Sequence, residues 1–139
     1  MQILEQPGKE QPESRGQAAG LIVSRQSGQP LVCLVTSRDT GRWIVPKGKV
    51  KRGEEPARCA EREALEEAGV IAHAAETPIA FISAGPGSAA LVPLFLLEAM
   101  EILEDWPEKA QRKRVWETPA TAARLAGDPN LVRVLLSLY

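Results

Sequence analysis

Aromatic residues, histidine and cysteine are all scarce in this sequence. Phe, Trp and Tyr together make up 4% of its 139 residues, so few side chains could line an aromatic pocket for a nucleobase. The two cysteines, Cys33 and Cys59, lack the repeated spacing of a disulfide framework and the Cys or His neighbours of a zinc site, so we expect two reduced thiols. The single histidine, His73, has no catalytic partner in sequence, which favours a surface position on a strand.

Long apolar runs and a strong excess of one charge are also absent. Nowhere do about eighteen apolar residues follow one another, so the sequence predicts no membrane span. Residues 1–14 lack the basic and apolar segments of a signal peptide, and their polar content predicts a mobile or partly ordered lead-in. The net charge of −1 argues against general nucleic-acid binding. Together these absences indicate a cytoplasmic protein.

With 44% hydrophobic and 25% charged residues, the chain suits one compact domain, which we expect to cover residues 15–139. Aliphatic and β-branched runs predict strands at 17–24 and 31–36 (a hairpin), 43–45, 70–74, 79–83 and 114–117, with a long apolar run at 89–100. Cap and breaker residues predict helices at 55–68, from 118 to a break at 127–129, and at 130–139, with a loop at 47–53. Strands mixed with a few helices indicate an α/β sheet covered on both faces.

Glycine and charged residues stand at fixed spacing in the stretch GKVKRGEEPARCAEREALEEAGV. The specified positions are Gly48, Glu54, Arg62, Glu63, Glu66, Glu67 and Gly69. With each residue type at a usage of about 7%, seven such positions coincide by chance on the order of once in 10^8 starting points. The pattern is therefore specific, although it covers a small part of the chain.

The second half of this motif is expected to form a helix. No glycine interrupts it, Pro56 stands where a first helical turn tolerates proline, and the final glycine provides a C-terminal stop. Glu63, Glu66 and Glu67 then share one face over an arc of about 100°, because residues at i, i+3 and i+4 align on a helix. A different face carries the small residues Ala57, Ala60, Ala64 and Ala68, which allow close packing on a sheet.

Three carboxylates on one helix face repel one another. Like charges at this spacing cost about 0.2–0.5 kcal/mol per pair, so the cluster is unfavourable unless a cation offsets it. A hard divalent ion bound through oxygen ligands would do so. The alternative is a solvated acidic face with Arg58 and Arg62 as partners, and for three glutamates outside this motif it would be the preferred interpretation.

The spacing of the motif resembles the Nudix box. Outside the box, the stretches RWIVPKG at 42–48 and ILEDW at 102–106, together with the basic triplet 112–114 followed by Trp116, resemble the diphosphoinositol polyphosphate phosphohydrolase branch of the Nudix hydrolases. Members of that branch and related enzymes also hydrolyse diadenosine polyphosphates. The likeness covers roughly residues 16–125, and it implies the family fold, an α/β/α sandwich with a mixed β-sheet.

The resemblance also implies a metal site. One to three Mg²⁺ ions, with Mn²⁺ as a possible substitute, would be held by Glu63, Glu66, Glu67 and the main-chain carbonyl of Lys47. Either Glu66 or Glu67 would take a proton from the attacking water, and Glu108 is an outside candidate for that role.

Other residues of these motifs are assigned to support and to substrate binding. Glu54 is expected to pair with Arg62 and so to fix the loop against the helix. Arginine and lysine side chains recognise phosphate oxygens, and by the resemblance the substrate contacts are Arg38, Arg42, Lys47, Arg112 and Arg114. Lys51 and Arg52 are expected to be solvated.

The sequence therefore predicts a Mg²⁺-dependent hydrolase that cleaves a phosphoanhydride bond in a polyphosphorylated small molecule, of the diadenosine polyphosphate or diphosphoinositol polyphosphate type. Residues 84–89 carry no basic side chain, unlike animal members of the branch, and this disfavours a crowded inositol polyphosphate. Alternatives are an RNA 5′-pyrophosphohydrolase, an oxidised-nucleotide pyrophosphatase, or a Nudix-like module that senses a ligand without hydrolysing it. Loss of a box carboxylate would favour the sensor, and none is lost here.

Overall fold

The computed structural model describes residues 16–138 of the chain. Its strands are β1 (Gln17–Ser24), β2 (Leu31–Thr36), β3 (Trp43–Ile44), β4 (Lys47–Lys49), β5 (Val70–Ala74), β6 (Ala80–Ser83), β7 (Leu91–Ile102) and β8 (Arg114–Glu117). Its helices are α1 (Pro56–Glu63), the π-helical turn η3 (Ala64–Ala68), the 3₁₀ turn η4 (Lys109–Gln111), α2 (Pro119–Ala126) and α3 (Pro129–Leu138). The expected lead-in at 1–14 lies outside the described residues.

The strands form one mixed sheet in the order β3-β2-β1-β7-β5. β1 and β7 run parallel at its centre, with Leu21 opposite Leu96. The pairs β1–β2, β1–β4, β2–β8, β5–β7 and β6–β7 are antiparallel. The predicted hairpin between the first two strands is confirmed, with Val23 opposite Val32.

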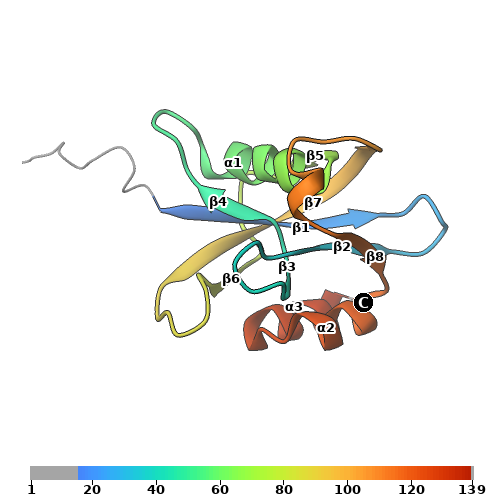
Figure 1. The fold of residues 1–139 in the computed structure, drawn as a ribbon. Helices are drawn as coiled ribbons and strands as arrows, with labels where there is room; N and C mark the ends of the chain where they lie inside the picture. Colours follow the sequence, from blue (N-terminus) through green and yellow to red (C-terminus); the bar gives the residue numbers. More distant parts are fainter. Residues whose placement is uncertain (1–15, 139) are drawn as a thin grey trace, which may run out of the picture.

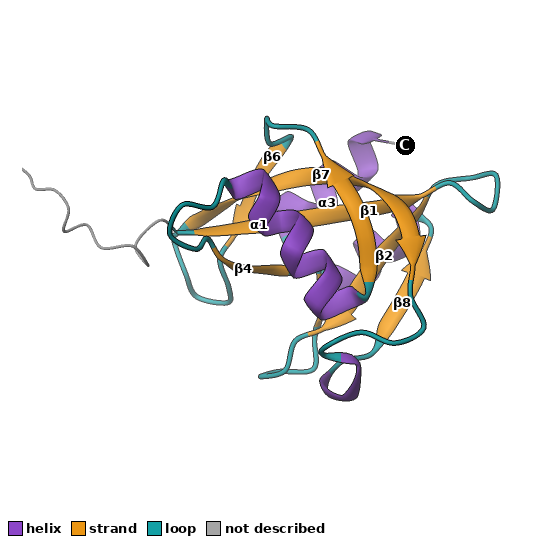
Figure 2. Cartoon of the chain, turned by 90° about the horizontal axis from the view of Figure 1, so that it is seen from above, coloured by secondary structure: helices purple, strands orange, loops and turns teal. Residues whose placement is uncertain are grey.

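Helices cover both faces of this sheet, with α1 on one side and α2 and α3 on the other (Figures 1 and 2). Leu21 packs with Leu131 and Leu135 of α3, whereas its neighbour Ile22 packs on the α1 side. Because β1 is buried on both faces, its sequence is a continuous apolar run. The predicted α/β/α sandwich with a mixed sheet is confirmed. Among residues 16–138, no helix combines the length and the apolar character that crossing a bilayer requires.

The helix expected at 55–68 is present as α1 followed by η3. Its four alanines are buried against the sheet, as predicted: Ala57, Ala60, Ala64 and Ala68. The loop expected at 47–53 is wrong in its first part, because residues 47–49 form β4 through backbone pairing with β1. The seventh strand starts and ends two residues later than the apolar run, since its pairing with β5 continues to Ile102.

The two cysteines and the single histidine differ in their exposure to solvent. Cys33 and Cys59 are buried free thiols, and burial raises the pKa of each to about 12. His73 lies exposed on β5, as expected, and its side chain is 70% exposed.

Candidate active site

The three glutamates sit at the junction between α1 and its π-helical extension. Glu63 and Glu67 are buried, with exposed fractions of 7% and 5%, and Glu66 is half-buried. Gly69 ends the helix with φ of +69°, a left-handed conformation that favours glycine. A Cβ atom at this position would lie 2.6 Å from the ring of Trp106, so only glycine fits.

Arg62 links the loop before the helix to the acidic face. Its guanidinium donates two hydrogen bonds to Glu54, at 2.8 and 3.0 Å, and one to the main-chain carbonyl of Lys49 at 2.9 Å. It also contacts Glu63 at 2.9 Å and Glu66 at 3.4 Å. The hydrogen bonds from Arg62 lower the pKa of Glu54, and those to Glu54 raise the pKa of Arg62. The pairing of Glu54 with Arg62 that the sequence predicts is therefore present.

Glu67 is held by a different pair of residues, Lys47 and Arg112. Its Oε1 accepts a hydrogen bond from the main-chain N–H of Lys47 at 3.4 Å, and its Oε2 lies 3.4 Å from Nη2 of Arg112. The side chains of Glu67 and Arg112 are each only 6% exposed. Burial raises the pKa of Glu67 to about 8, and the nearby Glu63 adds to this rise, whereas Arg112 opposes it.

A solvated acidic face is therefore wrong for Glu63 and Glu67, because both are buried. It is also wrong for Arg58, whose ion pairs are with Glu61 and Glu76, each at 3.1 Å. In the structure, the cations that face the three glutamates are Arg62 and Arg112.

The donor set fits a hard divalent cation in its chemistry. Within residues 16–138, no group of three or more acidic, histidine or cysteine side chains is gathered at metal-binding geometry. However, three carboxylates from one helix face supply the oxygen ligands that Mg²⁺ prefers. Gly48 leaves room beside them, because a Cβ atom there would lie 2.1 Å from Oε2 of Glu63.

Two of the predicted phosphate-binding arginines make internal contacts. Arg112 donates to the Glu108 carboxylate at 2.8 Å and to the main-chain carbonyl of Thr36 at 2.9 Å. Arg114 donates to the carbonyls of Ala68 and Leu103 at 2.8 and 2.9 Å. Their contact with substrate stays a prediction.

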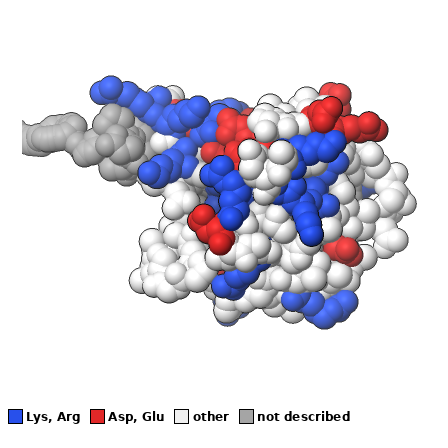
Figure 3. Space-filling view, in the orientation of Figure 1, with Lys and Arg blue, Asp and Glu red and all other residues white. Residues whose placement is uncertain are grey.

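The other basic residues considered from the sequence are exposed or half-buried. Arg38 and Arg42 are exposed, as are Lys51 and Arg52, and Lys47 is half-buried. Figure 3 shows Lys and Arg atoms on both sides of an acidic patch on the same face of the molecule. This arrangement suits a substrate that carries several phosphates together with a cation.

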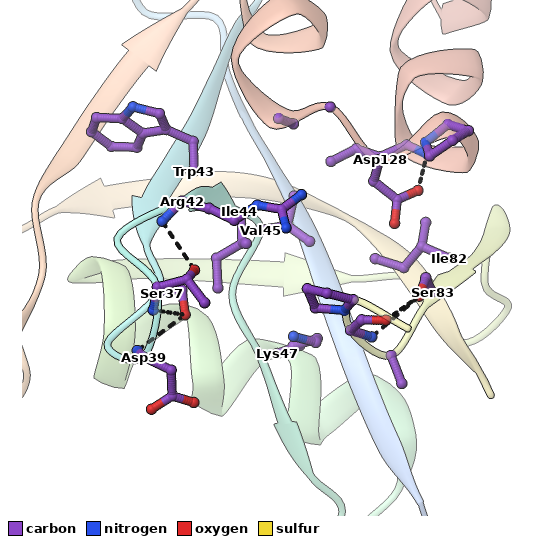
Figure 4. A pocket seen from close by; sticks show the side chains of 18 of the residues that line it. Ser37, Asp39, Arg42, Trp43, Ile44, Val45, Lys47, Ile82, Ser83 and Asp128 are labelled. Atoms are coloured by element: carbon purple, nitrogen blue, oxygen red, sulfur yellow. Dashed lines mark hydrogen bonds between the residues drawn. The ribbon is translucent and has the colours of Figure 1, made fainter. Parts of the chain in front are cut away.

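A pocket of about 460 Å³ opens next to Lys47 (Figure 4). Its walls come from residues 37–45, which include β3, from the end of β6 with the turn at 84–87, and from the junction between α2 and α3 at 126–131. Its charged lining residues are Asp39, Arg42, Lys47 and Asp128. The sequence predicted the break at 127–129, but it did not show that this segment and the turn at 84–87 line one pocket.

Similar proteins were found by sequence. A family model described as "NUDIX domain" matches residues 14–136. The mouse (Mus musculus) diphosphoinositol polyphosphate phosphohydrolase 3-alpha is 34% identical over 108 residues, which cover 76% of this chain and 65% of that protein. Nudix hydrolase 12, mitochondrial, of Arabidopsis thaliana is 33% identical over 113 residues, or 75% of this chain and 56% of that protein. The matched regions thus span less than two-thirds of the length of these relatives.

Solved structures show the same fold. The crystal structure of a C. elegans Ap4A hydrolase binary complex superposes with a TM-score of 0.69 at 20% identity, covering 88% of this chain and 94% of that chain. A NUDIX family hydrolase from Clostridium perfringens gives a TM-score of 0.65 at 18% identity, covering 88% and 97%. Since the family model spans most of the sequence, the chain belongs to the Nudix family.

Proposed function

We propose that this protein hydrolyses a phosphoanhydride bond in a polyphosphorylated small molecule with the help of Mg²⁺. The observation that carries this proposal is the acidic face formed by Glu63, Glu66 and Glu67, two of them buried. None of the three lines the pocket, but the main-chain N–H of Lys47, a lining residue, donates to Glu67. The hydrolase names of the curated relatives and the complete set of box residues support it. The protein would act in the cytoplasm.

The residues divide into cation ligands and phosphate contacts. Glu63, Glu66, Glu67 and the main-chain carbonyl of Lys47 would hold one to three Mg²⁺ ions, and Mn²⁺ could take their place. Bound Mg²⁺ supplies a Lewis acid for the phosphate oxygens and lowers the pKa of water near it. The side chains of Arg38, Arg42 and Lys47 would contact phosphates, because Arg38 and Arg42 are exposed and Arg42 and Lys47 line the pocket.

The proton of the attacking water would pass to Glu66 or Glu67. Both stand on the face that holds the cation, and a carboxylate can accept this proton near neutral pH when the water is activated. Glu108 is the third candidate. Its N–H donates to the carbonyl of Glu66 at 3.0 Å, and its carboxylate is bound to Arg112.

The pocket favours a nucleoside-bearing substrate such as a diadenosine polyphosphate. Its lining has two cations, Arg42 and Lys47, against two anions, Asp39 and Asp128. An uncharged sugar and base can occupy such a pocket, whereas an inositol ring with phosphates on most carbons would meet the two carboxylates. A diphosphoinositol polyphosphate is the second candidate, because the mouse relative acting on that class is 34% identical.

A panel of substrates tests the proposal. The protein with Mg²⁺ is incubated with diadenosine polyphosphates, diphosphoinositol phosphates, nucleoside triphosphates, oxidised nucleotides and 5′-triphosphate RNA, and products are separated by anion-exchange chromatography. We expect the highest kcat/KM for a diadenosine polyphosphate. Preferential cleavage of RNA or of an oxidised nucleotide would replace the proposed substrate class. Ligand binding with no product from any compound would favour the sensing module.

A further inference from the structure

Four consecutive main-chain carbonyls at the C-terminal end of the catalytic helix, those of residues 66–69, accept hydrogen bonds from one distant segment, residues 103–114. The last carbonyls of a helix have no partner within the helix and need donors from elsewhere. Here the carbonyl of Glu66 accepts from the N–H of Glu108 at 3.0 Å, and that of Gly69 accepts from the N–H of Leu103 at 2.8 Å. Between them, side chains at 106 and 114 bind the carbonyls of residues 67 and 68.

Trp106 and Arg114 provide these two side-chain contacts. Nε1 of Trp106 donates to the carbonyl of Glu67 at 3.0 Å, and Nη1 of Arg114 donates to that of Ala68 at 2.8 Å. The Arg114 guanidinium also lies 4.2 Å from the centre of the Trp106 ring, while the backbone of Gly69 lies close to that ring. The two side chains therefore support each other as well as the helix end.

The bound turn is also the one that carries the catalytic glutamates. Residues 64–68 form a π-helical turn, which is rare, appears often at functional sites and changes the direction of its side chains relative to an α-helix. Glu66 and Glu67 stand within it. Lys47, Arg112 and Arg62 contact the two carboxylates themselves, whereas the contacts at the carbonyls hold the backbone from which both side chains project.

We propose that Trp106 and Arg114 are positioning residues that hold this turn, and thereby set the geometry in which Glu66 and Glu67 receive the cation. The inference rests on the proposed function for its catalytic consequence. It gives Arg114 a different role from the phosphate contact expected from sequence, and it explains the stretch at 102–106, which the substrate pocket does not use. Loss of such supporting contacts typically lowers metal affinity or activity by about 10- to 100-fold.

Two variants separate this role from the alternatives. Arg114→Met keeps a long apolar stem but has no donor, and Trp106→Phe keeps a ring on Gly69 but removes the N–H bound to Glu67. Leu135→Val is the matched control, because it weakens the core on the α3 side without touching the site. For each full-length protein we would measure the Mn²⁺ affinity without substrate, and kcat and KM with Mg²⁺.

We expect both variants to bind Mn²⁺ at least about 10-fold more weakly and to lose about 10- to 100-fold in kcat, with KM within about threefold of the wild type. The control should change neither affinity nor kcat. An unchanged Mn²⁺ affinity with a raised KM in Arg114→Met would assign Arg114 to phosphate binding and overturn the proposal. Lower melting temperatures with unchanged affinity and kcat would reduce both residues to a purely structural role, which also overturns it.

Amide hydrogen exchange tests the support of the turn independently of catalysis. Residues 64–69 should exchange faster in Arg114→Met and in Trp106→Phe than in Leu135→Val, because only the first two remove donors at this helix end. If wild-type protein bound no Mn²⁺, the proposed function would fail while this measurement still decided the inference. Equal exchange in all three variants would overturn it.

Discussion

Glu67 combines a buried carboxylate, a guanidinium partner and a place in the supported helical turn. Glu67→Gln keeps the shape of the side chain but can neither ionise nor accept a proton. We expect kcat to fall by at least about 100-fold, because either a cation ligand or the proton acceptor is lost. Steady-state assays at saturating Mg²⁺, with circular dichroism as the check on folding, measure this effect. Near wild-type turnover would show that Glu67 has neither role.

At the scale of the secondary-structure element, one ion pair attaches the loop before α1 to that helix. Arg62 and Glu54 have side chains that are 21% and 15% exposed, and Glu54 also accepts the N–H of Lys51 at 2.9 Å. Glu54→Gln should lower the free energy of unfolding by about 1–3 kcal/mol, because it weakens two charge-assisted hydrogen bonds in a partly buried place. Urea denaturation measures the change.

The exposed pair between Lys109 and Asp105 provides the comparison for this prediction. Asp105 has a side chain that is 95% exposed, so Asp105→Asn removes an ion pair that solvent already screens. If Glu54→Gln changed stability no more than Asp105→Asn, the loop would not depend on Arg62 for its attachment.

At the scale of the whole molecule, the proposed cation site would couple folding to cation binding. A ligand that binds only the folded state stabilises it by about 2.7 kcal/mol at 100 times its Kd, which for a protein of this size raises the Tm by roughly 8 °C. We therefore expect Mg²⁺ to raise the Tm of the wild type. Differential scanning calorimetry with and without Mg²⁺ measures the shift.

The variant with Gln at positions 63, 66 and 67 is the control for that experiment. Its Tm should not change when Mg²⁺ is added. Its Tm without metal should equal or exceed that of the wild type. The variant loses the repulsion among the three carboxylates, while Arg62 and Arg112 keep their ion pairs with Glu54 and Glu108. If the protein were an active enzyme but its Tm did not change with Mg²⁺, the proposal that the acidic face binds the cation would be contradicted.

The local pattern of the box was enough to predict its helix, because glutamate spacing, Pro56 and Gly69 are all properties of neighbours along the chain. The pairing of Glu54 with Arg62 was also predictable, since both belong to one short motif. By contrast, the places of Arg112 and Arg114 were not. Their partners at Thr36, Glu67 and Ala68 are brought near them only when β8 pairs with β2 beside the end of η3.

By itself, the sequence determined the family, the two-sided sheet and the face that carries Glu63, Glu66 and Glu67, because periodicity and motif spacing act over a few turns of chain. Only the tertiary structure decided which cations face those glutamates, how the end of their helix is held and where the pocket lies. Each of these features joins segments that are far apart along the chain, such as the turn at 84–87 and the junction between α2 and α3 at 126–131. The spacing of residues within one segment does not predict contacts between distant segments, because those contacts depend on the register and packing of the sheet.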